Sequence, residues 1–218
     1  EVEVFSVMAP GDGRYHGSVS ELKLTIEYVL REKPESYWDK LSKFAPGVVP
    51  EMEHWQAAVN FIRDQSIPKE LDMLLRALWI GAEAKSRGVQ HIHAHFATIS
   101  TRMAALVKIL YGIPFSFTCH AKDIFRETVN RNLFRELTDH SSFGITVSDF
   151  NRQYILDNTP GIDSDKIKRL YNGINMNFFE VPTDRSHLSA NPEQIISVGR
   201  LVPKNGFDVL LHAITILV

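Results

Sequence analysis

Three histidines alternate along one short segment of the sequence, with His91, His93 and His95 two residues apart. In a strand this spacing places all three imidazoles on one face, where they could hold a metal ion if His120 and Asp123 supplied further ligands. The alternative is that His91 and His93 are packed or hydrogen-bonded strand residues and that only His95 reaches a cleft. We favour this alternative and predict no metal site.

A second group of polar side chains follows directly after the segment FSFTC. His120, Lys122 and Asp123 bring an imidazole, an ammonium group and a carboxylate to the end of a predicted strand. Such a trio can position or neutralise a phosphorylated substrate. The alternative is a surface loop whose charged side chains have no function. Cys119 is expected to be a small core residue rather than a nucleophile.

Two cations, Arg200 and Lys204, stand in a turn between a predicted strand and a predicted helix. Together with the amides at the helix start they would suit a pyrophosphate, and the alternative is a solvated loop. Gly11, Gly13 and Gly17 miss the dinucleotide-binding spacing by one residue, and nothing in the sequence matches a Walker loop. Dehydrogenase and P-loop functions are therefore disfavoured.

These side chains depend on a regular alternation of strands and helices. The sequence predicts strands at residues 2–7, 90–96, 114–119, 143–147 and 166–171. Helices are predicted from Pro68 to Gly88, over 99–111, near 130–140 and from Ser148, while residues 18–66 give only short, weak helical patterns. Such alternation forms a parallel sheet, with ligands at the carboxyl ends of its strands. We predict an α/β fold, a Rossmann-like, mostly parallel sheet with helices on both faces.

The last part of the chain forms a separate unit in this prediction. Residues 1–175 are expected to be one Rossmann-like domain, 176–193 a linker, and 194–218 a strand, a turn and a helix, the strand covering 194–198. The chain begins without Met inside a predicted strand and stops inside a predicted helix. We therefore expect it to be a fragment.

Composition excludes several classes of protein. With Lys+Arg 24 against Asp+Glu 26, no global positive field exists to hold nucleic acid. The single cysteine cannot form an internal disulfide and favours a reducing cytoplasm. The longest nearly apolar stretch, 209–218, is too short to span a bilayer. We expect a soluble, cytoplasmic protein, and peripheral contact with the inner face of a membrane stays open.

Five motifs follow one another along the chain: HAHFATISTRMA, FTCHAKDIF, ITVSDFNRQYI, LYNGIN and ISVGRLVPKNGFDVLLHA. In this order they resemble the large retaining family 4 glycosyltransferases, most of all bacterial enzymes of colanic acid and exopolysaccharide assembly. The resemblance is strong over residues 90–218. It is weak at the opening strand, which looks like the family's second strand.

The resemblance implies the GT-B fold, in which two Rossmann-like domains face each other, the acceptor largely in the first and the nucleotide-sugar in the second. His120 resembles the family histidine beside the transferred sugar and its phosphate. Arg200 resembles the arginine that holds the donor diphosphate, and Lys204, in the same turn, is assigned to the catalytic set with it. Substrate contacts are implied for His95, Phe96, Thr98, Asp123, Ser148, Asn172 and Gly173.

Retaining transfer of this kind needs neither a protein nucleophile nor a cofactor. The departing phosphate, held by cations, accepts the acceptor's proton as the sugar changes partners on one face. Catalysis then consists of positioning and charge stabilisation.

Two departures from the family pattern matter. Asn205 stands where the family motif carries Lys before Gly, and a neutral amide cannot replace a point charge on pyrophosphate. The family's first strand and helix have no counterpart here, nor has most of its second domain with the paired glutamates that hold the nucleotide-sugar. We therefore expect the chain alone to transfer no sugar at an appreciable rate.

Three functions remain in competition. The leading one is a glycosyltransferase, or a piece of one, that moves a sugar from a nucleotide-sugar to a polysaccharide or lipid-linked acceptor with retention. The second is a non-catalytic half-protein that binds glycan or a partner chain. The third is a histidine-dependent metal hydrolase.

The missing first strand is central in the family's sheet, so its absence should leave two open strand edges. Residues 194–218 supply one strand and one amphipathic helix. One hypothesis is that they occupy this place, within the same chain or in a strand-exchanged homodimer. The alternative is that they begin the second domain.

Overall fold

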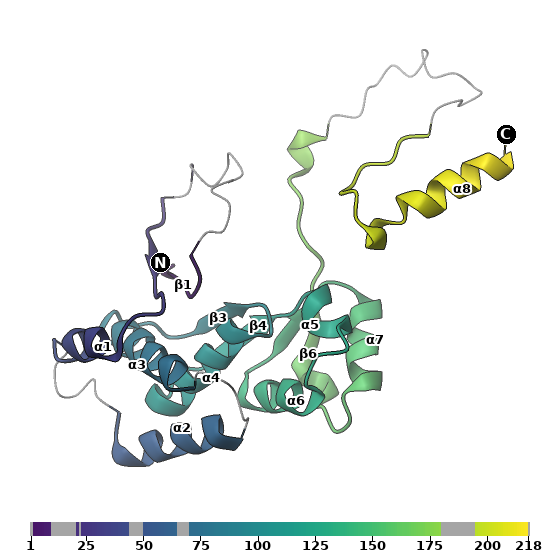
Figure 1. Ribbon diagram of the computed structural model, residues 1–218. Coiled ribbons are helices and arrows are strands. Elements are labelled where there is room, and N and C mark those ends of the chain that lie inside the picture. The colour runs from purple at the N-terminus through teal and green to yellow at the C-terminus, as the bar shows by residue number, and fades with distance from the viewer. Residues whose placement is uncertain are drawn as a thin grey trace. The chain divides into compact units, whose positions relative to one another are not determined.

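The computed structural model describes residues 2–9, 21, 23–43, 50–64, 70–179 and 195–217. It divides into two compact units, Glu1–Asn172 and Gly173–Val218, which are treated separately below. Figure 1 shows the order of the elements along the chain.

The larger unit contains a four-stranded parallel sheet in the order β3-β4-β5-β6. Its strands are Ile92–His95, Phe115–Thr118, Gly144–Thr146 and Ile167–Arg169. In the register of the first pair, His93 lies beside Ser116 and His95 beside Thr118. Each of these strands was predicted, and the parallel α/β fold is confirmed.

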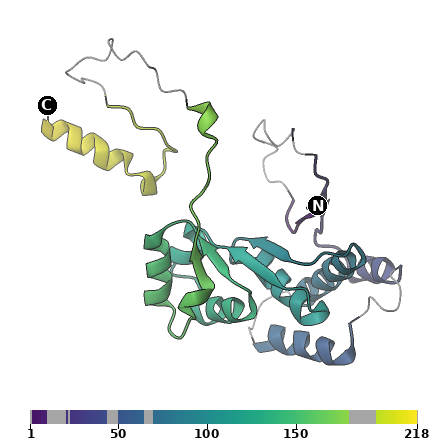
Figure 2. The ribbon, with the colours of Figure 1, turned by 180° about the vertical axis from the view of Figure 1, so that it is seen from behind.

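Two helices cover one face of this sheet. α4 (Ile99–Tyr111) and α6 (Arg131–His140) lie on the side where Phe115 and Phe117 are buried, and Figures 1 and 2 show both helices on the same side of the strands. The rings of Phe117 and Phe134 meet edge to face, with centroids 5.9 Å apart. A Cβ at Gly144 would lie 2.6 Å from the Phe117 ring, so only glycine fits there.

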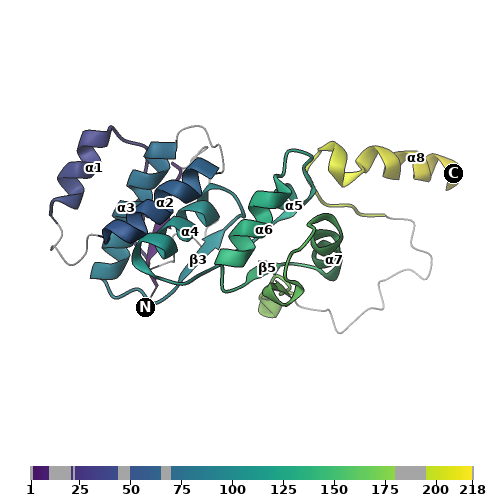
Figure 3. The ribbon, with the colours of Figure 1, turned by 90° about the horizontal axis from the view of Figure 1, so that it is seen from below.

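Additional helices complete the larger unit. α3 (Glu70–Ser86) packs along α4, and α2 (Met52–Asp64) contacts both. Figure 3 shows these helices in front of the strands. α1 (Pro34–Leu41) also packs on α3, and the short α5 (Ala121–Phe125) contacts α7 (Asp149–Asn158).

The opening strand does not belong to the four-stranded sheet, so the prediction of one continuous sheet was wrong. β1 (Val4–Ser6) instead pairs in parallel with β2 (Ile26–Tyr28). β2 was not predicted, although the alternating run LKLTIEY is typical of a strand. Among the described residues, neither β1 nor β2 pairs with a strand of the four-stranded sheet, and a strand forms where a neighbour offers backbone hydrogen bonds.

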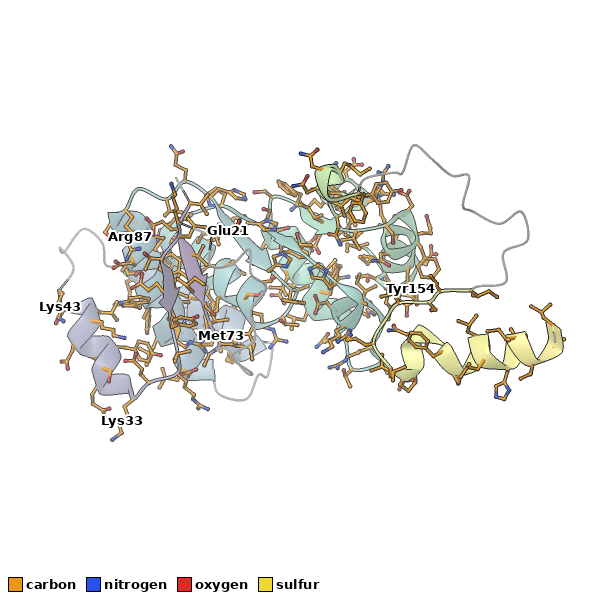
Figure 4. The ribbon with its side chains drawn as sticks, turned by 90° about the horizontal axis from the view of Figure 1, so that it is seen from above. Glu21, Lys33, Lys43, Met73, Arg87 and Tyr154 are labelled. Atoms are coloured by element: carbon orange, nitrogen blue, oxygen red, sulfur yellow. The ribbon has the colours of Figure 1, made fainter. Side chains whose placement is uncertain are left out.

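The pair β1-β2 is held on α3 by side-chain contacts. The Phe5 and Trp79 rings meet edge to face, and buried Arg76 donates to the carbonyls of Val7 and Val29 just beyond the two strands. Arg87, labelled in Figure 4, bonds Glu3 and Glu27 at 2.8 Å each. These contacts fix β1-β2 on the helix that precedes β3.

The smaller unit contains a 3-10 turn, Pro203–Asn205, and the helix α8 (Phe207–Leu217). The predicted strand at 194–198 is not formed: residues 195–198 have no regular secondary structure, and Val198 is 94% exposed. A strand needs a hydrogen-bonded neighbour, and no described residue of this unit forms one. Most of the predicted linker, residues 180–193, lies outside the described residues, as does residue 194 at the start of the predicted strand.

Among the helices in the described part of the chain, none is both long enough and apolar enough to cross a membrane.

Candidate functional site

Two predicted site histidines meet where β3 and β4 end. His95 is the last residue of β3, and His120 lies two residues after Thr118, the last residue of β4. His95 Nδ1 and His120 Nε2 are 3.0 Å apart, and the two rings are parallel within 2° with centroids 4.9 Å apart. His95 is exposed and His120 half-buried. The structure therefore brings both imidazoles to the carboxyl edge of the sheet.

The hydrogen bond between these rings limits the charge that they carry together. One nitrogen must donate and the other must accept, so a doubly protonated pair would place two N–H groups against each other. Partial burial and the neighbouring His120 lower the pKa of His95, and the Asp123 carboxylate opposes this shift. The pair thus bonds as two neutral rings or with a single shared positive charge. Such a pair can donate hydrogen bonds to an anionic oxygen.

Asp123 lies three residues after His120 and is 4% exposed. Its Oδ2 accepts hydrogen bonds from the backbone N–H groups of Ala97 and His120, each at 3.0 Å. The carboxylate therefore ties the loop after β3 to the start of α5. This geometry favours a positioning role over the substrate contact that the sequence suggested.

The loop after β3 carries two more of the predicted contacts, Phe96 and Thr98. Phe96 is 47% exposed, and its ring centroid is 4.9 Å from that of His120. Thr98 is exposed and precedes the first residue of α4. Phe96 and Thr98 therefore border the same edge as the histidine pair.

His91 and His93 are both hydrogen-bonded, as the second interpretation of the sequence proposed, although only His93 lies in the strand and His91 directly precedes it. Ser116 Oγ lies 2.8 Å from His91 Nε2 and 2.9 Å from His93 Nδ1, and Thr118 Oγ1 lies 2.9 Å from His93 Nε2. Burial and the neighbouring histidines lower the pKa of His93. Within the part of the chain that the structure describes, no group of three His, Cys, Asp or Glu side chains could hold a metal ion.

Sequence reasoning missed Ser116 and Thr118. Both are buried and lie opposite the histidines in the parallel register. Their alternation with Phe115 and Phe117 was the available signal, because one face of β4 is apolar and the other carries hydroxyls.

Cys119 is fully buried, and burial raises the pKa of its thiol to about 12. It is a core residue, in keeping with the sequence-based expectation. Lys122 is exposed on α5.

Ser148 is the N-cap of α7, where its hydroxyl accepts a hydrogen bond from the Asn151 N–H at 3.1 Å. Asp149 follows it and binds Arg169 Nε at 3.1 Å and the Tyr171 hydroxyl at 3.2 Å. Asn172 is exposed at the end of the larger unit. Ser148 thus caps the helix, and Asp149 holds Arg169 at the end of β6.

Gly173, Arg200 and Lys204 belong to the smaller unit. Arg200 is exposed, and the side chain of Lys204 lies outside the described residues. Asn205 Nδ2 donates to the Arg200 carbonyl at 2.7 Å. The amide at the position of the expected lysine therefore closes the turn.

Comparison with known proteins identifies the family. Residues 39–178, more than half of the chain, match the sequence profile of Glycosyltransferase Family 4. The chain belongs to glycosyltransferase family 4. This match includes β3, β4 and the histidine pair, and it ends before the turn with Arg200.

A further similarity agrees with the family 4 assignment. The chain is 28% identical over 148 residues to an uncharacterized glycosyltransferase of Methanocaldococcus jannaschii. The aligned part covers 66% of this chain and 39% of that relative. The chain thus spans about two fifths of the length of the relative that it matches.

Proposed function

We propose that this protein takes part in glycosyl transfer, with the larger unit serving as the acceptor side of a GT-B enzyme. A sugar would move from a nucleotide-sugar to a polysaccharide or lipid-linked acceptor with retention of configuration, as in exopolysaccharide assembly. A cytoplasmic site is part of the proposal, because a single cysteine suits a reducing compartment. Contact with the inner face of a membrane would fit a lipid-linked acceptor.

One observation carries the proposal: a chain of glycosyltransferase family 4 places His95 and His120 side by side at the carboxyl edge of its parallel sheet. Ligands of open α/β sheets bind at such edges. We assign His120 the place beside the transferred sugar and its phosphate. Its contribution would be hydrogen bonding to the charge that develops on the departing phosphate. His95 would share the proton and fix the ring.

The smaller unit is proposed to begin the donor-binding domain, with Arg200 and Lys204 on the donor diphosphate. Its apolar side chains support this: no described residue of α8 is buried, and Ile216 is 84% exposed. A helix with an uncovered apolar face requires a further layer. Exchange of 194–218 into a second copy is the competing arrangement, and it predicts a dimer in solution.

The second candidate function is a non-catalytic protein that binds glycan or a partner chain. Asn205 favours it, because the amide bonds the backbone of its own turn instead of offering a charge to a diphosphate. A metal hydrolase has less support, because the histidines of its candidate site are otherwise engaged: His91 and His93 bond two hydroxyls, and His95 bonds His120.

Calorimetry separates the first two functions. The chain is titrated at millimolar ligand with UDP-glucose, GDP-mannose and the two free diphosphates. We expect one nucleotide-sugar to bind more tightly than its own diphosphate, and His120→Ala to abolish this difference. His54→Ala, which removes an exposed imidazole on α2, is the control and should retain it. No difference in the wild type, or a difference that survives His120→Ala, would contradict the proposal.

A further inference from the structure

Phe96 has an unusual backbone conformation for a large side chain. Its φ is 72°, the single positive φ among the described non-glycine residues. This left-handed region suits glycine or asparagine and strains a residue with a bulky Cβ substituent. Strain of this kind persists where surrounding contacts enforce it, and it concentrates at functional sites.

The contacts that enforce it are all present. The Phe96 N–H donates to the Thr118 carbonyl at 2.8 Å, and the Phe96 carbonyl accepts from Thr101 Oγ1 at 2.7 Å and Ser100 Oγ at 3.0 Å. The next N–H, of Ala97, is held by Asp123. Both backbone polar groups of Phe96 and the N–H of Ala97 are therefore used, and the conformation is fixed before any ligand arrives.

The strain does not serve to bury the ring. Phe115 and Phe117 in β4 are fully buried, whereas Phe96 remains 47% exposed. Its ring plane is tilted by 52° to that of His95 and by 54° to that of His120, with centroids 5.6 and 4.9 Å away. The parallel imidazoles and the phenyl ring thus form a corner with one polar side and one apolar side.

We propose that Phe96 is a stacking platform for a pyranose ring of the acceptor, which makes the acceptor's reacting end a carbohydrate. This rests on the proposed function and specifies it. A pyranose has a flat face of C–H groups edged by hydroxyls, so its face fits the phenyl ring while its hydroxyls reach the imidazole nitrogens. Asp123 is the positioning residue for this platform.

The test combines sugar binding with stability. Saturation-transfer NMR is recorded with methyl β-D-glucopyranoside and methyl β-D-galactopyranoside on the 218-residue chain. We expect at least one to bind with its C–H face saturated. Phe96→Gly and Phe96→Ala should weaken binding by roughly three- to tenfold, the range that one aromatic contact contributes. Phe96→Tyr, which keeps the ring, should retain it, as should Trp38→Ala, which removes an exposed ring on α1.

Stability distinguishes a strained platform from an ordinary surface residue. Both short variants lose the ring, but only alanine keeps the backbone strain, so Phe96→Gly should unfold at a higher urea concentration than Phe96→Ala. The opposite order, or sugar binding that survives Phe96→Gly, would overturn the inference. Absence of any sugar binding would also overturn it, while the calorimetric difference at His120 would stand. If the nucleotide-sugar bound no more tightly than its diphosphate while the glucoside still bound at Phe96, only the proposed function would be refuted.

Discussion

Replacement of Asp123 tests how the site is assembled. Its Oδ2 accepts two backbone hydrogen bonds at 3.0 Å while the side chain is almost fully buried. A hydrogen bond to a charged group contributes about 1.5–3 kcal/mol, so Asp123→Ala removes roughly 3–6 kcal/mol of interaction. Ala97 and His120 are only partly buried, and we therefore expect a loss near the lower end, about 3 kcal/mol. Asp123→Asn keeps an acceptor and should cost about half as much.

Urea unfolding measures the change, and the slope m should stay constant if only the folded state is affected. The matched control is Asp149→Asn, an exposed carboxylate that also has two partners and should change stability by at most about 1 kcal/mol. Because Asp123 raises the pKa of His95, its loss should lower that pKa further in an NMR titration. If Asp123→Ala costs no more than the control and leaves the His95 titration unchanged, the positioning argument is refuted.

Three further predictions concern stability and activity. Lys166 Nζ donates to the carbonyls of Thr138, Asp139 and Ser141 at the end of α6, so Lys166→Met should lower the free energy of unfolding by about 2 kcal/mol in urea. Burial is the main cause that lowers the pKa of His93 and of His140, so both histidines bind protons more readily in the unfolded chain. Their contribution to stability is therefore complete above pH 6.5 and is lost as the pH falls below that value. We expect the urea midpoint of unfolding to be lower at pH 5.5 than at pH 7.5. The chain alone should yield no product from a panel of nucleotide-sugars.

Each of these has a contrary result. Lys168→Met, at an exposed position on β6, should leave the free energy of unfolding unchanged. An equal loss of stability in both lysine variants would show that the bonds of Lys166 to the end of α6 do not stabilise the fold. The pH argument would be contradicted if the urea midpoint were higher at pH 5.5 than at pH 7.5 and if His140→Phe left this difference unchanged. Product formation that His120→Ala abolishes would show that the chain is sufficient for transfer.

The strand-helix alternation from residue 90 to residue 171 could be predicted because its signals are local. Helix α4 covers the predicted residues 99–111, where Gly112 adopts a left-handed C-cap. β1 and β2 were harder, because which strands become neighbours depends on long-range pairing that local patterns do not specify. The apolar segment 195–198 shows the same limit, since composition favours a strand but only a neighbour can form one.

The candidate site could be located from the sequence but not constructed from it. Placing His95 and His120 at strand ends was sufficient to predict that they meet at one edge. The burial of Asp123 was not predictable, because a carboxylate near a strand end is as compatible with solvent as with two backbone N–H groups. The left-handed turn at Phe96 was hidden for a related reason, since phenylalanine carries no local preference for that conformation.

The most direct test of the central claim is an NMR map of the 218-residue chain as a nucleotide-sugar is added. The claim is that the edge formed by His95 and His120 receives the sugar and its phosphate. It predicts that the largest shifts occur at the ring signals of these two histidines and at the Ala97 amide that Asp123 holds. Largest shifts at His91 and His93, or on the distant α2, would contradict the claim, as would a spectrum that does not change.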